Sequence, residues 1–169
     1  MRILIVLLFL VVSLTSAGQT IIKNEVIDTG SNVIETSWET LNNTISTITY
    51  FRFRKVDSTI YMEIKALYYI GPFTVKENNK LIFLLSNGNY ATLYNTEYRR
   101  SKIGDCDLAV GGKNKMGINL IYRIKNEDIE ELMKYRILRF KIVTSIGFIE
   151  EARLEHKVFS NAIALVINN

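Results

Sequence analysis

The sequence predicts an α+β fold in which a mainly antiparallel sheet, strongly bent or partly barrel-like, carries a short helix and a C-terminal amphipathic helix. Three observations support this prediction. Between residues 46 and 144, short segments of alternating apolar and polar residues follow one another, as half-buried strands do. Turn residues separate most of these segments, which favours antiparallel pairing. Apolar residues at helical spacing follow near residues 126–134 and 158–166.

Residues 1–17 have the ordered features of a secretory signal peptide. Arg2 gives a positive start, residues 3–12 are apolar, and small residues lead to a cleavage point after Ala17. A buried first strand or a short membrane anchor is the alternative, although an apolar run of this length is too short to span a bilayer as a helix. We therefore expect export to the periplasm or the extracellular space, with no membrane span after cleavage.

Residues 18–169 are expected to form a single α+β domain, because no linker, internal repeat or change of composition divides them. The net charge of +4 is mildly basic and falls by one unit if Arg2 is removed. Cys106 is the only cysteine, which excludes an intramolecular disulfide. The aspartates on either side of Cys106 disfavour the reactive thiolate, so an unreactive thiol is expected, with an intermolecular disulfide as the alternative.

Residues 46–56 and 60–70 predict one long hairpin that turns at Asp57-Ser58-Thr59. Phe51 and Phe53 share its inward face. The outward face would carry Tyr50, Arg52, Arg54, Tyr61, Glu63 and Lys65. Such a strip can stack on bases or sugars and attract anions, although cross-strand pairs of these types are also ordinary sheet stabilisation.

The next hairpin is centred on Asn87-Gly88-Asn89, whose residues tolerate the positive φ of a tight turn. It joins residues 80–86 to residues 90–94. Because residues 81–85 are apolar on both faces, they predict a central strand that is covered on both sides. We accordingly expect Leu84 to be buried, and likewise Phe140 on a later strand.

A strand over residues 118–124 should lead into a short helix that Asn126 caps. A strand over residues 138–144 should then point Leu138, Phe140 and Ile142 inward. These two strands are either parallel, as in a β-α-β unit, or antiparallel with the helix between them. Residues 148–157 fit a last strand or a helix equally well, and the helical stripe from Val158 onward predicts a C-terminal helix lying on the sheet.

Residues 97–116 form a long, polar, glycine-bearing stretch, which predicts a loop of the kind that often carries binding residues. The candidate binding residues are Arg99, Arg100, Lys113 and Lys115, whose charges favour an acidic partner. A solvated, tolerant loop is the alternative.

The sequence predicts no catalytic residue, metal ligand or cofactor. His156 is the only histidine, which excludes two-histidine zinc motifs and leaves a nucleophile one candidate base. The chain contains no nucleophile elbow, phosphate-binding loop or calcium-loop pattern.

The sequence therefore favours an exported, non-enzymatic domain that binds an unknown partner or ligand. Two alternatives stay open: an exported hydrolase-like enzyme with a site near the 97–116 loop, and a structural component of the cell envelope. Export argues against a nucleic-acid partner. The oligomeric state is not predicted.

Four motifs in the second half of the chain carry a resemblance. They are residues 81–88 (Leu-Ile-Phe-Leu-Leu-Ser-Asn-Gly), Tyr94-Asn95, residues 126–129 (Asn-Glu-Asp-Ile) and residues 138–142 (Leu-Arg-Phe-Lys-Ile). In this order, behind a signal peptide, they resemble small uncharacterised exported proteins of Bacteroidota. The resemblance implies a periplasmic or surface-associated α+β domain and assigns no site residue.

Overall fold

The computed structural model describes residues 20–27, 30–44, 46–104, 115–152 and 156–169. Most of the strands form one antiparallel sheet in the order β1-β2-β4-β5-β11-β8-β7-β12-β13, and β6 pairs with β9 separately. The strands are β1 (Ile21–Val26), β2 (Asn32–Thr36), β3 (Glu39–Asn43), β4 (Thr47–Val56), β5 (Thr59–Tyr68), β6 (Thr74–Val75), β7 (Lys80–Leu85), β8 (Tyr90–Asn95), β9 (Arg99–Arg100), β10 (Lys102–Ile103), β11 (Met116–Ile124), β12 (Ile137–Thr144) and β13 (Gly147–Ala152). The helices are α2 (Asn126–Lys134) and α3 (His156–Ile167).

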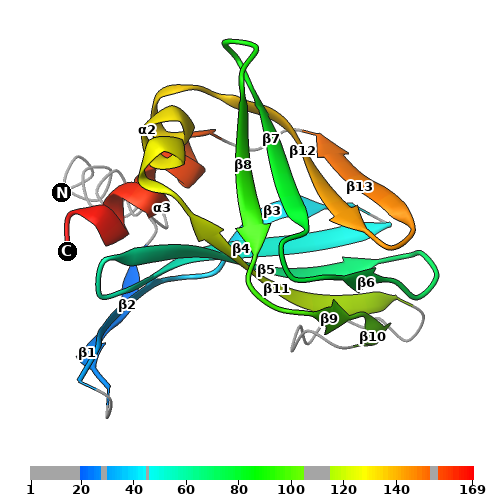
Figure 1. The fold of residues 1–169 in the computed structure, drawn as a ribbon, viewed down its shortest axis with the longest axis horizontal. Coiled ribbons are helices and arrows are strands. Elements are labelled where there is room, and N and C mark those ends of the chain that lie inside the picture. The colour runs from blue at the N-terminus through cyan, green and yellow to red at the C-terminus, as the bar shows by residue number, and fades with distance from the viewer. Residues whose placement is uncertain (1–19, 28–29, 45, 105–114, 153–155) are drawn as a thin grey trace, which may run out of the picture.

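Two strands share one of their edges between two partners, and this bends the sheet. β4 pairs with β2 near Arg54 and with β3 near Tyr50. β11 pairs with β10 at Met116 and with β8 at Tyr122. As a result β7, β8 and β12 run steeply across the direction of β4, β5 and β11 (Figure 1). The sheet does not close, and its path ends at β1 and β13.

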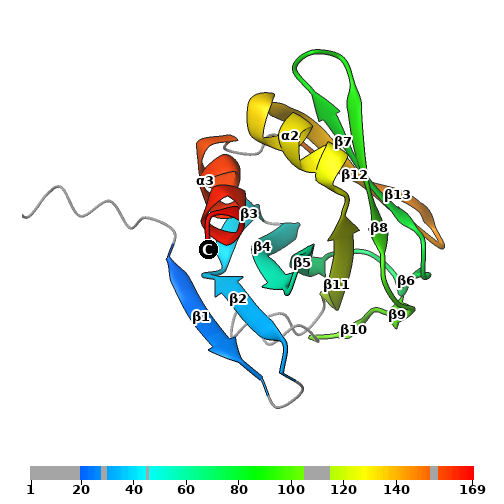
Figure 2. The same ribbon diagram turned by 60° about the vertical axis from the view of Figure 1, so that its left-hand side comes forward.

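The core lies on the concave side of this bent sheet, where α3 packs. Phe159 of α3 contacts Phe53, Phe51 and Phe83, with ring centroids 5.1, 5.4 and 5.8 Å away. Phe51 and Phe53 belong to β4, whereas Phe83 belongs to β7 in the other half of the sheet. Phe159 therefore joins the two halves, and Figure 2 shows α3 beside β4 at the end of the molecule that also carries α2.

Short contacts tie the two halves together at the opposite end. β6 pairs with β9 through Thr74 and Arg100. The Ser145 N–H donates to the Thr74 carbonyl, and the Thr74 N–H donates to Ser145 Oγ, both at 2.9 Å. This places the β12–β13 turn next to β6 and β9, as Figure 1 shows on its right-hand side.

The structure confirms the mainly antiparallel sheet and the C-terminal helix. Both predicted hairpins form, β4 with β5 and β7 with β8, and Gly88 has a φ of 84° in its turn. The first hairpin turns more tightly than predicted, since Thr59 already pairs with Val56. More than half of the described residues are in strands, so the fold is mostly β and not a balanced α+β fold. Of the two expected shapes, strongly bent or partly barrel-like, the sheet is bent and does not close.

Several finer predictions were wrong or incomplete. Leu84 is only half-buried because its side of β7 faces outward, whereas Phe140 is buried. Leu138 is 44% exposed, and Ile137 is buried in its place, because the register between β12 and β7 shifts between Ile137 and Arg139. Such a bulge reverses the faces of the residues before it.

The helical region also differs from the prediction. Lys125 occupies the N-cap of α2 without a side-chain hydrogen bond, so Asn126 is the first helical residue and not the cap. The strands on either side of α2 are antiparallel and are separated in the sheet by β8 and β7. Residues 147–152 form β13, and helix α3 begins at His156, two residues before the predicted Val158. Within the described residues, no helix has the length and apolar character needed to cross a membrane.

The predicted 97–116 loop is only partly a loop. β9 and β10 occupy its first part, and Met116 already belongs to β11. Residues 105–114, which include Cys106 and Lys113, lie outside the described residues. The predicted signal peptide over residues 1–17 lies outside them as well.

Candidate functional site: a basic groove on the convex face

The strip of polar side chains predicted for the β4–β5 hairpin exists on the convex face. Tyr50 lies opposite Lys65, and Arg52 lies opposite Glu63. Because side chains alternate along a strand, these residues face away from the core that Phe51 and Phe53 enter. The predicted outward face of this strip is therefore confirmed, and the observed register brings its members together across the two strands.

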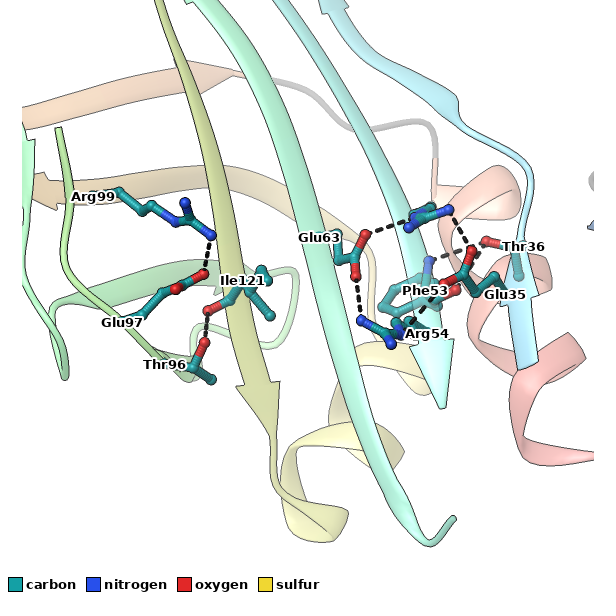
Figure 3. A network of polar contacts seen from close by, with 10 residues as sticks. Glu35, Thr36, Phe53, Arg54, Glu63, Thr96, Glu97, Arg99 and Ile121 are labelled. Atoms are coloured by element: carbon teal, nitrogen blue, oxygen red, sulfur yellow. Dashed lines mark hydrogen bonds and ion pairs between the residues drawn. The ribbon is translucent and has the colours of Figure 1, made fainter. Parts of the chain in front are cut away.

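Four of the charged residues on this face form a closed ring. Arg52 donates from Nη1 to Glu35 Oε2 at 2.6 Å and from Nε to Glu63 Oε2 at 2.7 Å. Arg54 contacts the other oxygens of the same two carboxylates at 3.3 and 3.5 Å. Figure 3 shows the ring lying over β4 and β5. Both carboxylates are buried, so the ring is a fixed, electrically balanced part of the sheet surface.

Trp38 lies above this ring because of the way the chain passes from β2 to β3. These strands share one edge of β4, and Trp38 is in the short link between them. The Arg52 guanidinium and the Lys65 ammonium each lie 4.8 Å from the centre of a Trp38 ring. Both cations come from the convex face, so both approach the half-buried indole from the side of the sheet.

A basic groove runs from Trp38 across β5 and β11 toward β9. It consists of two adjoining hollows of about 260 and 170 Å³, which share Arg99 and Asn119 in their linings. The residues that line it are Trp38, Arg52, Glu63, Ile64, Lys65, Tyr98, Arg99, Arg100, Lys102, Ile118, Asn119, Leu120 and Ile121. Five of these side chains are cationic and one is a carboxylate.

Arg99 reaches the groove from β9 and pairs there with Glu97 (Figure 3). Asn119 lies on the convex side of β11, and its Oδ1 atom is buried without a hydrogen-bond partner among the described residues. The groove therefore offers cationic donors at its walls and an unused amide acceptor at its floor.

The four residues predicted as binding residues are distributed unevenly over the structure. Arg99 and Arg100 line the basic groove and are exposed. Lys115 is half-buried beside Gly104 and is not among the groove residues, and Lys113 lies outside the described residues. Trp38 was not among the predicted binding residues, although it is the only tryptophan in the sequence, which was a signal that could have pointed to it.

A second cluster of polar side chains is buried on the core side of the sheet. The Thr49 hydroxyl donates to Glu151 Oε1 at 2.9 Å, while Glu151 Oε2 and the Tyr68 and Tyr122 hydroxyls have no hydrogen-bond partner among the described residues. Burial raises the pKa of Tyr68 well above its ordinary value, and the negative charge of Glu151 raises it further. Burial alone raises the pKa of Tyr122. Both phenols therefore stay protonated in the folded protein.

The described residues assemble no metal site from three or more His, Cys, Asp or Glu side chains. His156 begins α3, and the position of its side chain lies outside the description. Ser101, a hydroxyl residue of the 97–116 segment, is buried and exchanges hydrogen bonds with the backbone of Phe73. Its hydroxyl is therefore engaged in structure and is not presented to a substrate.

No protein family, no curated protein and no solved structure matches this chain.

Proposed function

We propose that the protein is an exported, non-enzymatic domain that binds an anionic ligand in the basic groove. The observation that supports this proposal most directly is the lining of the groove, in which five cationic side chains accompany one carboxylate. Cations remain in excess when Glu35 and Glu97, which pair with Arg52 and Arg99, are counted as well. A concave surface with an excess of one charge attracts ligands of the opposite charge and raises their local concentration.

The chemistry of the lining favours carboxylate, phosphate or sulfate groups. Arg99 and Arg100 present guanidinium groups, which bind such oxyanions through paired N–H donors. The ion pairs to Glu35 and Glu63 already hold Arg52 in place, so binding orders little more of that side chain. Trp38 adds a flat apolar surface at the other end, which suits a ligand with a ring or an extended carbon skeleton.

Export is the second part of the proposal and rests on residues 1–17. Their order of positive, apolar and small residues is that of a cleavable signal peptide. An exported domain meets few nucleic acids, so acidic proteins, glycans and small organic or inorganic anions are the relevant ligand classes.

The only tryptophan gives a direct test, because Trp38 lies in the groove and its fluorescence reports on that place alone. The protein would be titrated with inorganic tripolyphosphate and with polyglutamate at two salt concentrations. We expect saturable fluorescence changes, with affinity that falls as salt rises.

Three variants make this test specific. The double variant Arg99→Glu, Arg100→Glu should weaken binding by about tenfold or more, since each reversal replaces attraction by repulsion. The variant Glu97→Gln should tighten binding, because it removes the carboxylate beside Arg99. The control Lys134→Glu, Lys157→Glu makes the same change of net charge on α2 and α3. If the groove variant binds both anions as the control does, the proposed site is wrong.

A further inference from the structure

One end of the molecule gathers exposed apolar side chains. Six large apolar residues of this end are between 38% and 71% exposed. They are Tyr69, Ile70, Tyr98, Ile103, Ile146 and Phe148, which we call the apolar tip. Single exposed apolar residues are ordinary on protein surfaces, but their concentration at one end is not.

Backbone pairing and the course of the ribbon both place these residues at one end. Ile103 pairs with Met116, which pairs with Tyr68 next to Tyr69. On the other side, Ser145 binds Thr74 of β6, which pairs with β9. Figure 1 shows β6, β9, β10 and the β12–β13 turn together on the right, away from both helices. The apolar tip is therefore opposite the end covered by α2 and α3.

Cationic side chains surround the apolar tip. Arg100 and Lys102 lie on either side of Ser101, between Tyr98 and Ile103 in the chain, and both are exposed. Lys141 lies 5.8 Å from the ring centre of Phe148. Among the described residues, the carboxylates of Glu97 and Glu150 also lie near the tip, and they pair with Arg99 and Lys141. Exposed aromatic and aliphatic tips next to basic residues are the composition of proteins that bind the interface of anionic membranes.

We propose that the apolar tip docks on the surface of a bilayer that contains anionic lipids, with lipid phosphates as the anions that Arg99 and Arg100 bind. This inference rests on the proposed function, because the same two arginines serve both. A bilayer fits better than a protein partner because cationic side chains lie beside the apolar residues, as at the interface of an anionic membrane. The hollow beside them is lined by three cations together with Tyr98, Ile118 and Asn119, so it is not the apolar pocket that a protein side chain would fill.

The test uses the full mature protein and sedimentation with vesicles of phosphatidylcholine, with or without phosphatidylglycerol. Wild type should sediment with the mixed vesicles and not with phosphatidylcholine alone. The tip variant Ile103→Ser, Phe148→Ser should lower the partition coefficient by about tenfold or more, since it removes two apolar side chains from the lipid boundary. The control Ile22→Ser, Val26→Ser changes two other residues that are more than half exposed, both in β1, and should bind like wild type.

Titration with tripolyphosphate separates this inference from the proposed function. We expect the tip variant to keep its affinity for tripolyphosphate. The variant Arg99→Glu, Arg100→Glu should lose binding to both vesicles and tripolyphosphate. If wild type binds tripolyphosphate but not the mixed vesicles, the membrane inference is wrong, whereas the proposed binding of anions in the groove stands. If it binds neither, both proposals are wrong. If the tip variant keeps vesicle binding and instead changes self-association in analytical ultracentrifugation, the tip is a protein interface and the inference is also wrong.

Discussion

At the scale of single residues, burial separates two kinds of arginine on the convex face. The Arg52 side chain is 17% exposed and bonds to two buried carboxylates. Arg99 pairs with one carboxylate, and both partners of that pair are more than 40% exposed. Removing a carboxylate from the Arg52 pairs leaves a charge without compensation in a poorly hydrated place. Removing the carboxylate beside Arg99 costs little, because water hydrates the exposed guanidinium. The ring therefore contributes structure, and Arg99 retains freedom to engage a ligand.

The difference in burial between these ion pairs predicts how much stability is lost when the ring of Arg52, Arg54, Glu35 and Glu63 is broken. Glu63→Gln should lower the free energy of unfolding by about 1–3 kcal/mol, because two arginines then share the charge of Glu35 alone. Glu25→Gln, which breaks the exposed pair with Lys23, should cost less than about 0.5 kcal/mol. Urea denaturation of both variants measures the difference. Equal values would mean that the ring is no stronger than a surface pair.

The buried phenols predict a loss of stability in alkali. The pKa values of Tyr68 and Tyr122 are raised in the folded state, so above about pH 10 the unfolded chain releases protons that the folded protein keeps. The free energy of unfolding should therefore be unaffected by these groups below that pH and should fall above it. Tyr122→Phe should lessen the fall. Urea denaturation at a series of alkaline pH values tests this, and an identical slope in the variant would contradict it.

At the scale of elements, α3 is the piece that joins the two halves of the sheet. Its apolar stripe was visible in the sequence as Phe159, Ala162, Ile163 and Val166, all of which are buried. The stripe predicts a helix on the sheet, but it does not say which strands the helix contacts. Those contacts follow from the bend, which brings β4 and β7 to the same phenylalanine ring.

Truncation of that ring should be among the costliest core changes. Phe159→Ala should destabilise the protein by about 3–5 kcal/mol, because it leaves a cavity among Phe51, Phe53 and Phe83. Leu138→Ala is the control and should cost less than about 1 kcal/mol, since Leu138 is 44% exposed. Chemical denaturation compares the two. A small loss for Phe159→Ala would mean that α3 does not hold the sheet halves together.

The positions that sequence patterns misplaced share a physical cause. Leu138 was expected to point inward because strict alternation was assumed, and a one-residue bulge reversed it. Leu84 was expected to be buried because its strand is apolar on both faces, yet one face of β7 remains partly open. Alternation and turn residues predict that a strand exists, whereas a bulge or an open face depends on neighbours that are remote in the chain.

At the scale of the whole molecule, the candidate site is a product of topology. Arg99 and Arg100 were identifiable as a cationic pair within a polar segment. Trp38 and Asn119 reach the same groove from the β2–β3 link and from β11, because β11 inserts beside β5. No spacing along the chain relates these residues. The sequence therefore predicted part of one wall of the groove, and only the strand order brought the other residues to it.

The insertion of β11 beside β5 also affects how fast the chain can fold. Ile60 pairs with Ile124, which is remote in the chain, so the pairing of β5 with β11 must wait until all of the intervening chain has been synthesised. Domains dominated by such remote contacts fold slowly, on the order of milliseconds to seconds. For a chain that begins with an export signal, as we predict, this delay is useful. If the predicted signal directs export, the pairing of β5 with β11 would not form before the chain enters a translocation channel, and the sheet would be completed only after β11 has emerged on the far side.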